Sequence, residues 1–185
     1  MKTPPLPRIR LMGLLAAIVA AVALPSCVTT SPIGERVPVA AADDFRTSLR
    51  AADPLLVHEG LPHQAHEREI MQREAARKDV AWIQGYPYYT PAVRAKQPEA
   101  LRRVLADPAS YRPYGGPKTC GGFHPDYAVT WKSGGVTRHV AICFGCGEVL
   151  FSDGGPRLPY NLTDSALAEL RAAFASHAAK RPPRG

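Results

Sequence analysis

The sequence predicts an α+β fold, a small antiparallel β-meander covered by two or three helices. The main indication is Gly134-Gly135, because a Gly-Gly pair supplies the positive φ angles that a tight hairpin turn requires. Apolar residues alternate with polar ones on both sides of this pair, between residues 127 and 142. Two amphipathic segments, 98–106 and 164–178, predict helices that cover the resulting sheet.

The hairpin also has a predicted register. With the two glycines as loop residues, Tyr127 lies opposite Ile142, and Val129 lies opposite Val140. This register puts the apolar side chains on one face of the sheet, whereas a shift by one residue would scatter them over both faces. A further strand-like run, Glu148–Phe151, follows a glycine-rich break.

The remaining elements have weaker patterns. Residues 43–52 and 63–78 predict helices, and Thr163 is a suitable N-cap for the helix that follows it. Residues 80–83 predict a strand, and the Tyr/Pro-rich segment 86–91 predicts a loop. The tyrosines of such a loop either pack onto a small core or stack on a glycan.

Length and composition limit the protein to one modest globular domain. The chain has 185 residues, of which 45% are hydrophobic and 21% are charged. Disordered chains are less hydrophobic, and multi-span membrane proteins are less charged, so the composition excludes both classes.

The N-terminus has the pattern of an export signal. Lys2, Arg8 and Arg10 precede an unbroken apolar run over residues 11–23, and the first ten residues contain no acid. This run is shorter than the roughly 17–25 residues that a membrane-spanning helix needs. We therefore expect a cleaved signal peptide.

The end of this segment, Leu24-Pro25-Ser26-Cys27, resembles the lipobox of bacterial lipoproteins. The resemblance implies a signal peptide over 1–26 and acylation of Cys27, which would anchor the protein to a membrane. Val28, rather than Asp, after the cysteine favours the outer membrane. The alternative is ordinary signal-peptidase cleavage, which would leave Cys27 as a free thiol.

The mature chain has three predicted parts: a tether over 27–40, a single α+β domain over 41–179 and a basic Pro-rich tail over 180–185. Removal of three basic residues with the signal peptide lowers the formal charge from +7 to +4. The tail either touches anionic lipid or stays solvated. Nothing in the charge pattern indicates nucleic-acid binding, and the pattern identifies no protein or glycan partner.

One cluster of residues carries recognisable chemistry. The hairpin register brings His124 and Cys143 to the same end of the sheet, and Cys120 and Cys146 lie close to them in sequence. Three sulfurs and an imidazole are therefore expected to converge.

Three chemistries fit this cluster. Cys143-x₂-Cys146-Gly resembles the knuckle of zinc ribbons, and with Cys120 and His124 it would complete a tetrahedral zinc site, with Asp126 as a partner of the histidine. A disulfide with one spare thiol is the second interpretation, because exported proteins meet oxidising conditions. Redox catalysis by the Cys143/Cys146 pair is the third, although no helix follows the motif to lower a thiol pKa.

Two further histidines, His63 and His66, lie with Glu67 within one turn of the predicted helix 63–78. They are a second candidate metal site, but histidines near the start of a helix are more often solvated.

The run Cys120-x₃-His124 followed by Cys143-Phe-x-Cys146 resembles a family of small bacterial proteins, many of them lipoproteins, over about residues 55–155. The resemblance implies no activity. We therefore expect a lipid-anchored envelope protein with a binding or structural domain stapled by zinc or by a disulfide. The alternative is an envelope thiol-redox enzyme that uses Cys143 and Cys146.

Overall fold

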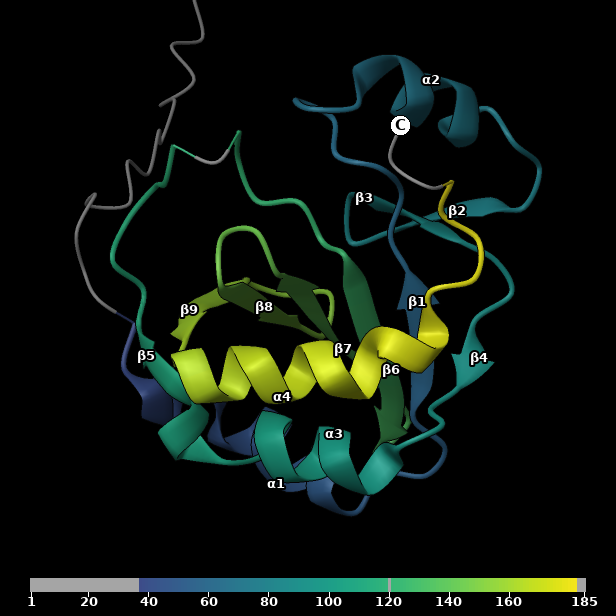
Figure 1. The fold of residues 1–185 in the computed structure, drawn as a ribbon. Coiled ribbons are helices and arrows are strands. Elements are labelled where there is room, and N and C mark those ends of the chain that lie inside the picture. Colours follow the sequence, from purple (N-terminus) through teal and green to yellow (C-terminus); the bar gives the residue numbers. More distant parts are fainter. Residues whose placement is uncertain (1–36, 120, 183–185) are drawn as a thin grey trace, which may run out of the picture. The chain divides into compact units, whose positions relative to one another are not determined.

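The computed structural model describes residues 37–119 and 121–182, and it confirms the α+β class. Its main sheet consists of β1 (Leu56–Glu59), β4 (Val93–Arg94), β5 (Tyr111–Pro113), β6 (Tyr127–Ser133), β7 (Val136–Cys143), β8 (Glu148–Ser152) and β9 (Leu158–Leu162). These seven strands follow the order β4-β1-β6-β7-β8-β9-β5, and every neighbouring pair is antiparallel (Figure 1). The predicted meander, β6 to β8, therefore forms the centre of a wider sheet.

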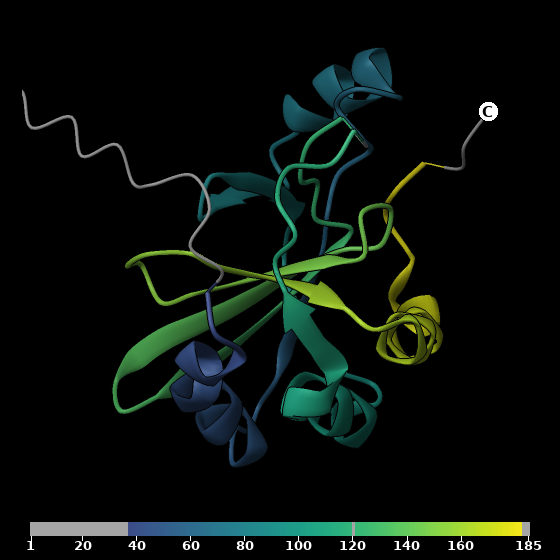
Figure 2. The ribbon, with the colours of Figure 1, turned by 90° about the vertical axis from the view of Figure 1, so that its left-hand side faces the viewer.

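Helices cover one face of this sheet, which we call the helix face. The three helices on it are α1 (Asp43–Arg50), α3 (Pro98–Leu105) and α4 (Asp164–Phe174). A two-stranded sheet of β2 (Val80–Ile83) and β3 (Tyr86–Tyr89) lies on the other side, together with α2 (Arg68–Ala75) (Figure 2). The described part of the chain has no helix that is both long and apolar enough to cross a membrane.

The central hairpin has the predicted register. Gly134 and Gly135 adopt φ angles of 57° and 79°, which a residue with a side chain rarely adopts. Tyr127 pairs with Ile142, and Val129 pairs with Val140. The glycine pair and the alternating pattern were therefore sufficient to fix this part of the fold.

Three predicted helices are confirmed, and the fourth is shorter than expected. Thr163 caps α4, since its hydroxyl accepts the N–H of Ala166 at 3.3 Å. The helix predicted over 63–78 begins only at Arg68. In the residues before it, side chains accept hydrogen bonds from backbone N–H groups. Glu67 accepts the N–H of His63, and His63 accepts the N–H of Ala65, both at 3.1 Å.

The prediction of a loop over 86–91 is wrong for its first four residues. Tyr86–Tyr89 form β3 and pair with β2 across a turn in which Gln84 and Gly85 both have positive φ. The outer strands β1, β4 and β5, and the last strand β9, were not predicted. Most of them are very short or contain proline, and β1, β4 and β5 pair with strands that are distant in sequence.

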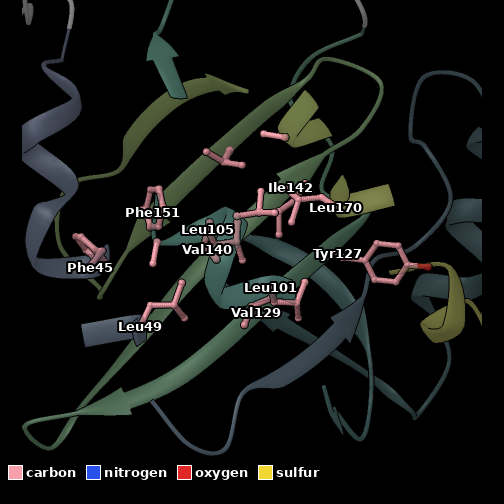
Figure 3. Packing of buried hydrophobic residues seen from close by; sticks show 14 of the residues in the cluster. Phe45, Leu49, Leu101, Leu105, Tyr127, Val129, Val140, Ile142, Phe151 and Leu170 are labelled. Atoms are coloured by element: carbon pink, nitrogen blue, oxygen red, sulfur yellow. The ribbon is translucent and has the colours of Figure 1, made fainter. Parts of the chain in front are cut away.

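The hydrophobic core lies on the helix face, between the main sheet and the helices α1, α3 and α4 (Figure 3). Phe45 and Leu49 of α1, Leu105 of α3 and Phe174 of α4 are all buried there. The strands contribute Tyr127, Val129, Trp131, Val140, Ile142, Val149, Phe151 and Tyr160. This single layer of packing fixes the sheet whose opposite face carries the candidate site.

Candidate functional site

The second face of the main sheet, which we call the polar face, carries rows of polar residues. One row crosses four strands through Cys143, Glu148, Asn161 and Arg112. Another crosses β6, β7 and β8 through Thr130, His139 and Ser152. Because side chains alternate along a strand, these residues come from the same strands that supply the core.

Cys143 is a buried free thiol at the end of β7, 1% exposed. The backbone N–H of Cys146 donates to its Sγ at 3.3 Å. The N–H of His124 also points at this sulfur and, like that of Cys146, favours the thiolate. Burial is the stronger effect, so the pKa of Cys143 is raised above its ordinary value.

Cys146 is disulfide-bonded, and Cys143 is the only free cysteine among the described residues. The Sγ of Cys146 lies 3.8 Å from the carbonyl oxygen of Gly122. Cys120 and Cys27 lie outside the described residues, so the predicted convergence of three sulfurs remains untested at Cys120. The other three predicted site residues, His124, Cys143 and Cys146, do lie at one end of the sheet.

The imidazole of His124 is buried among other histidines. Its Nε2 lies 3.2 Å from the carbonyl oxygen of Pro62, so this nitrogen carries the proton. Its ring lies 4.6 Å from that of His63, which in turn lies 4.5 Å from that of His66. Burial lowers the pKa of His124 to about 4. The neighbouring rings are tilted to one another by 38° and 39°. Within residues 37–119 and 121–182 no three His, Cys, Asp or Glu side chains are arranged to hold a metal ion.

Asp126, expected beside His124, has other partners. One carboxylate oxygen accepts the N–H of Phe144 at 2.7 Å, and the other accepts the Nη1 of Arg181 at 2.9 Å. This carboxylate therefore joins the β7–β8 turn to the C-terminal segment.

The C-terminal segment differs from the expected solvated tail. The buried carboxylate of Glu59 accepts three successive backbone N–H groups, those of residues 179–181, at 2.8 to 3.2 Å. The guanidinium of Arg181 also donates to the carbonyl oxygen of Gly60 at 2.8 and 3.1 Å. Residues 179–181 are thus bonded to β1 and to the chain that follows it.

A second polar cluster lies beneath β3. The Nε2 of His58 forms a hydrogen bond with the hydroxyl of Thr130 at 3.0 Å. The ring of Tyr88 lies 5.8 Å from that of His58 and 6.0 Å from that of His139. The hydroxyl of Tyr88 and both ring nitrogens of His139 have no hydrogen-bond partner among the described residues. Burial lowers the pKa of His58 and of His139 to about 4, so both are neutral at pH 7.

Sequence reasoning missed this cluster. His139 is polar in an otherwise alternating strand, and such a pattern predicts a solvent-facing side chain. β3 was predicted as a loop, so nothing in the sequence indicated that the polar face is covered. The one available signal was His139 itself, a titratable residue in the middle of a predicted strand.

The tyrosines of the predicted Tyr/Pro loop pack inward. Tyr88 and Tyr89 are at most 1% exposed, and the hydroxyl of Tyr89 donates to Glu74 at 3.0 Å. Of the two interpretations, packing onto the domain describes these two rings, and neither is available to stack on a glycan.

No family model matches the chain, and no curated protein or solved structure is significantly similar to it. Chemically, the Cys/His end of the sheet contains one disulfide sulfur, one buried thiol and a neutral imidazole. This set is suited to holding the end of the sheet together.

Proposed function

We propose that this chain is a lipid-anchored protein of the bacterial envelope, with a binding or structural domain that a disulfide staples. The observation that carries the proposal is the bonded sulfur of Cys146 beside the free, buried thiol of Cys143. Disulfides persist in exported proteins and are rare in the cytosol. The basic and apolar leader and the lipobox-like sequence at Cys27 support the same compartment.

Cys120 is the proposed partner of Cys146. Cys143 is free, and in this proposal Cys27 carries acyl chains, which leaves one cysteine. The backbone two residues after Cys120 also approaches the Cys146 sulfur, at Gly122. Such a bond would close a loop whose constraint stabilises a domain by about 3–4 kcal/mol.

A zinc ion bound by Cys120, His124, Cys143 and Cys146 is the alternative staple. It requires both Cys120 and Cys146 to be thiolates, and it requires the His124 ring to turn a nitrogen towards the sulfurs. A bonded Cys146 favours the disulfide.

Intact mass spectrometry of the full chain, with and without alkylation, tests the proposal. In denaturant without reductant we expect one alkylated thiol, and after reduction three, with Cys27 blocked and the mass increased by fatty acids. Peptide mapping should join Cys120 to Cys146. Three reactive thiols before reduction, together with one zinc per chain by elemental analysis, would instead establish the metal site. Alkylation of Cys27 would contradict the lipid anchor.

A thiol-redox enzyme is the second candidate, and one contact favours it. The N–H of Cys146 holds the Cys143 sulfur beside a bonded cysteine. A thiolate in this position is close enough to attack the disulfide in an exchange reaction. Burial and the raised pKa of Cys143 oppose it. Thiol–disulfide exchange with glutathione disulfide, measured for the full chain and for Cys143→Ser, distinguishes the two candidates. If the protein is a thiol-redox enzyme, the full chain should catalyse the exchange and the variant should not.

A further inference from the structure

The two-stranded sheet of β2 and β3 leaves one edge of β2 without a neighbouring strand in the described part of the chain, and we call this the open edge. All four residues of β2, Val80–Ile83, are apolar. Trp82 is 62% exposed, more than any other large hydrophobic side chain of the described residues, and the other three residues are half-buried. An apolar strand edge of this kind is a template on which another strand can pair.

The ladder between β2 and β3 determines which backbone groups point towards the open edge. In an antiparallel pair, hydrogen-bonded and non-hydrogen-bonded positions alternate along each strand. The N–H of Thr90 donates to the carbonyl oxygen of Asp79 at 2.7 Å, which fixes the alternation. Consistent with this, Trp82 pairs with Pro87, which has no N–H to donate. The N–H and C=O groups of Val80 and Trp82 therefore point away from β3.

The two outer strands of the main sheet are protected against such pairing. β4 has only two residues, one of them Arg94, and it begins shortly after Pro91. β5 contains Arg112 and ends at Pro113. Very short strands, charged side chains and proline are common means by which proteins prevent pairing at a sheet edge. β2 contains neither a charge nor a proline, so its open edge is suited to accept a further strand.

The charges at the two ends of β2 indicate what kind of strand the open edge can accept. Before β2, Arg77 pairs with Asp79 at 2.8 Å, whereas Lys78 is exposed and forms no ion pair with another described residue. After β2, the Nη2 of Arg157 donates to the carbonyl oxygen of Gln84 at 2.6 Å. Arg157 is also exposed and has no acidic partner within residues 37–119 and 121–182. Each end of the strand thus carries one cation without an acidic partner.

These two cations disfavour a second copy of the chain as the occupant of the open edge. If two β2 strands paired in antiparallel orientation, Lys78 of one copy would approach the turn of the other copy, where Arg157 is bonded to Gln84. Parallel pairing would instead place the two Lys78 side chains together. Like charges opposite each other destabilise a strand pair. The same two cations would favour a strand that has acidic residues at both ends.

We propose that the open edge of β2 binds an extended segment of another protein, with alternating apolar residues in its centre and acidic residues at both ends. The segment would add a third strand to the sheet of β2 and β3. Its backbone would bond to the outward groups of Val80 and Trp82, and its acids would lie beside Lys78 and Arg157. This inference names a partner for the binding role proposed above, but it requires neither acylation nor the disulfide.

Fluorescence anisotropy of a labelled peptide, titrated with the full chain in mild detergent, tests the proposal. The probe is a short blocked peptide of alternating valine and threonine with a pair of acidic residues at each end. We expect it to bind, and we expect a peptide with lysines in place of the acids to bind about tenfold more weakly or less. N-methylation of every second peptide residue can be made in two patterns. Only the pattern that blocks the N–H groups facing β2 should abolish binding.

Variants of Trp82 separate the backbone contribution from that of the ring. Trp82→Pro removes an outward N–H but no hydrogen bond to β3, and an edge strand tolerates proline at such a position. It should weaken peptide binding about tenfold or more, because a backbone hydrogen bond and the ring are both lost. Trp82→Ala keeps the N–H and should weaken binding less. The matched control is Val136→Ala, which shortens another exposed apolar side chain, on β7, and should leave the affinity unchanged.

Several results would overturn the proposal: no binding of the acidic peptide, equal binding of the lysine peptide, or binding that both N-methylation patterns leave intact. The methylated peptides test the natural protein, so the proposal stays testable even if Trp82→Pro does not fold. A concentration-dependent dimer in analytical ultracentrifugation that Trp82→Pro dissociates would show that a second copy occupies the open edge instead. Because the disulfide map and the fatty-acid mass are measured separately, failure here would leave the envelope proposal standing.

Discussion

The two faces of the main sheet are both buried, but they are built from different chemistry. Val140 faces the helices and belongs to the apolar core, whereas its neighbour His139 faces β3 and is 4% exposed. The same alternation separates Val129 from Thr130 along β6. One set of strands thus supplies an apolar layer and a polar layer.

The two layers differ in what burial contributes to the stability of the fold. On the helix face, burial of apolar surface is itself stabilising, at about 25 cal/mol per Å². On the polar face, the Tyr88 hydroxyl and the His139 nitrogens are buried without partners among the described residues. Each such group costs about 1–3 kcal/mol. We infer that the helix face supplies the stability that allows the polar face to carry a site.

The largest expected effect is therefore on the helix face. The ring of Phe174 is fully buried and stacks on that of Tyr127 at 4.6 Å. Phe174→Ala should lower the free energy of unfolding by about 3–5 kcal/mol, measured by urea denaturation. Trp82→Ala, which removes a ring that is 62% exposed, should change it by less than about 0.5 kcal/mol. Similar values for the two variants would contradict the assignment of the core.

The helix face was also the part that the sequence predicted well. The glycine pair at 134–135 and the alternating residues beside it determined the register, since turn chemistry and hydrophobic pattern are local signals. Thr163 and the residues after it predicted the start of α4 for the same reason.

The polar face was predicted only in part. His124, Cys143 and Cys146 were expected at one end of the sheet, and the register placed them there. His58, however, lies in a four-residue strand whose partners are distant in sequence, so its contact with Thr130 had no local signal. The docking of Arg181 on Gly60 and Asp126 likewise depends on tertiary structure alone.

The next prediction uses pH to separate the faces. Burial, and secondarily the charges of His58 and Arg157, lower the pKa of His139 from 6.5 to about 4. Between these values the unfolded chain binds a proton that the folded chain does not, so stability is full above pH 6.5 and falls towards pH 4. The loss is about 3 kcal/mol for this histidine.

Urea denaturation at pH 7 and at pH 4.5 measures this loss. Between pH 7 and pH 4.5 the free energy of unfolding of His139→Leu should fall by roughly 2–3 kcal/mol less than that of the natural protein. Val140→Ala changes the adjacent residue, which lies on the other face. It should lower the free energy of unfolding by the same amount at both pH values. A pH dependence that His139→Leu leaves unchanged would show that this imidazole is not neutral in the fold.

The smallest predicted effect compares two buried tyrosine hydroxyls, one on each face. The hydroxyl of Tyr111 donates to the carbonyl oxygen of Leu105 at 2.6 Å, whereas that of Tyr88 has no partner among the described residues. Tyr111→Phe should lower the free energy of unfolding by about 1 kcal/mol, the net contribution of one hydrogen bond. Tyr88→Phe should leave it unchanged or raise it, because the variant buries one unsatisfied group fewer. A loss in Tyr88→Phe equal to that in Tyr111→Phe would mean that the polar face satisfies this hydroxyl after all, and the contrast between the two faces would then rest on the histidines alone.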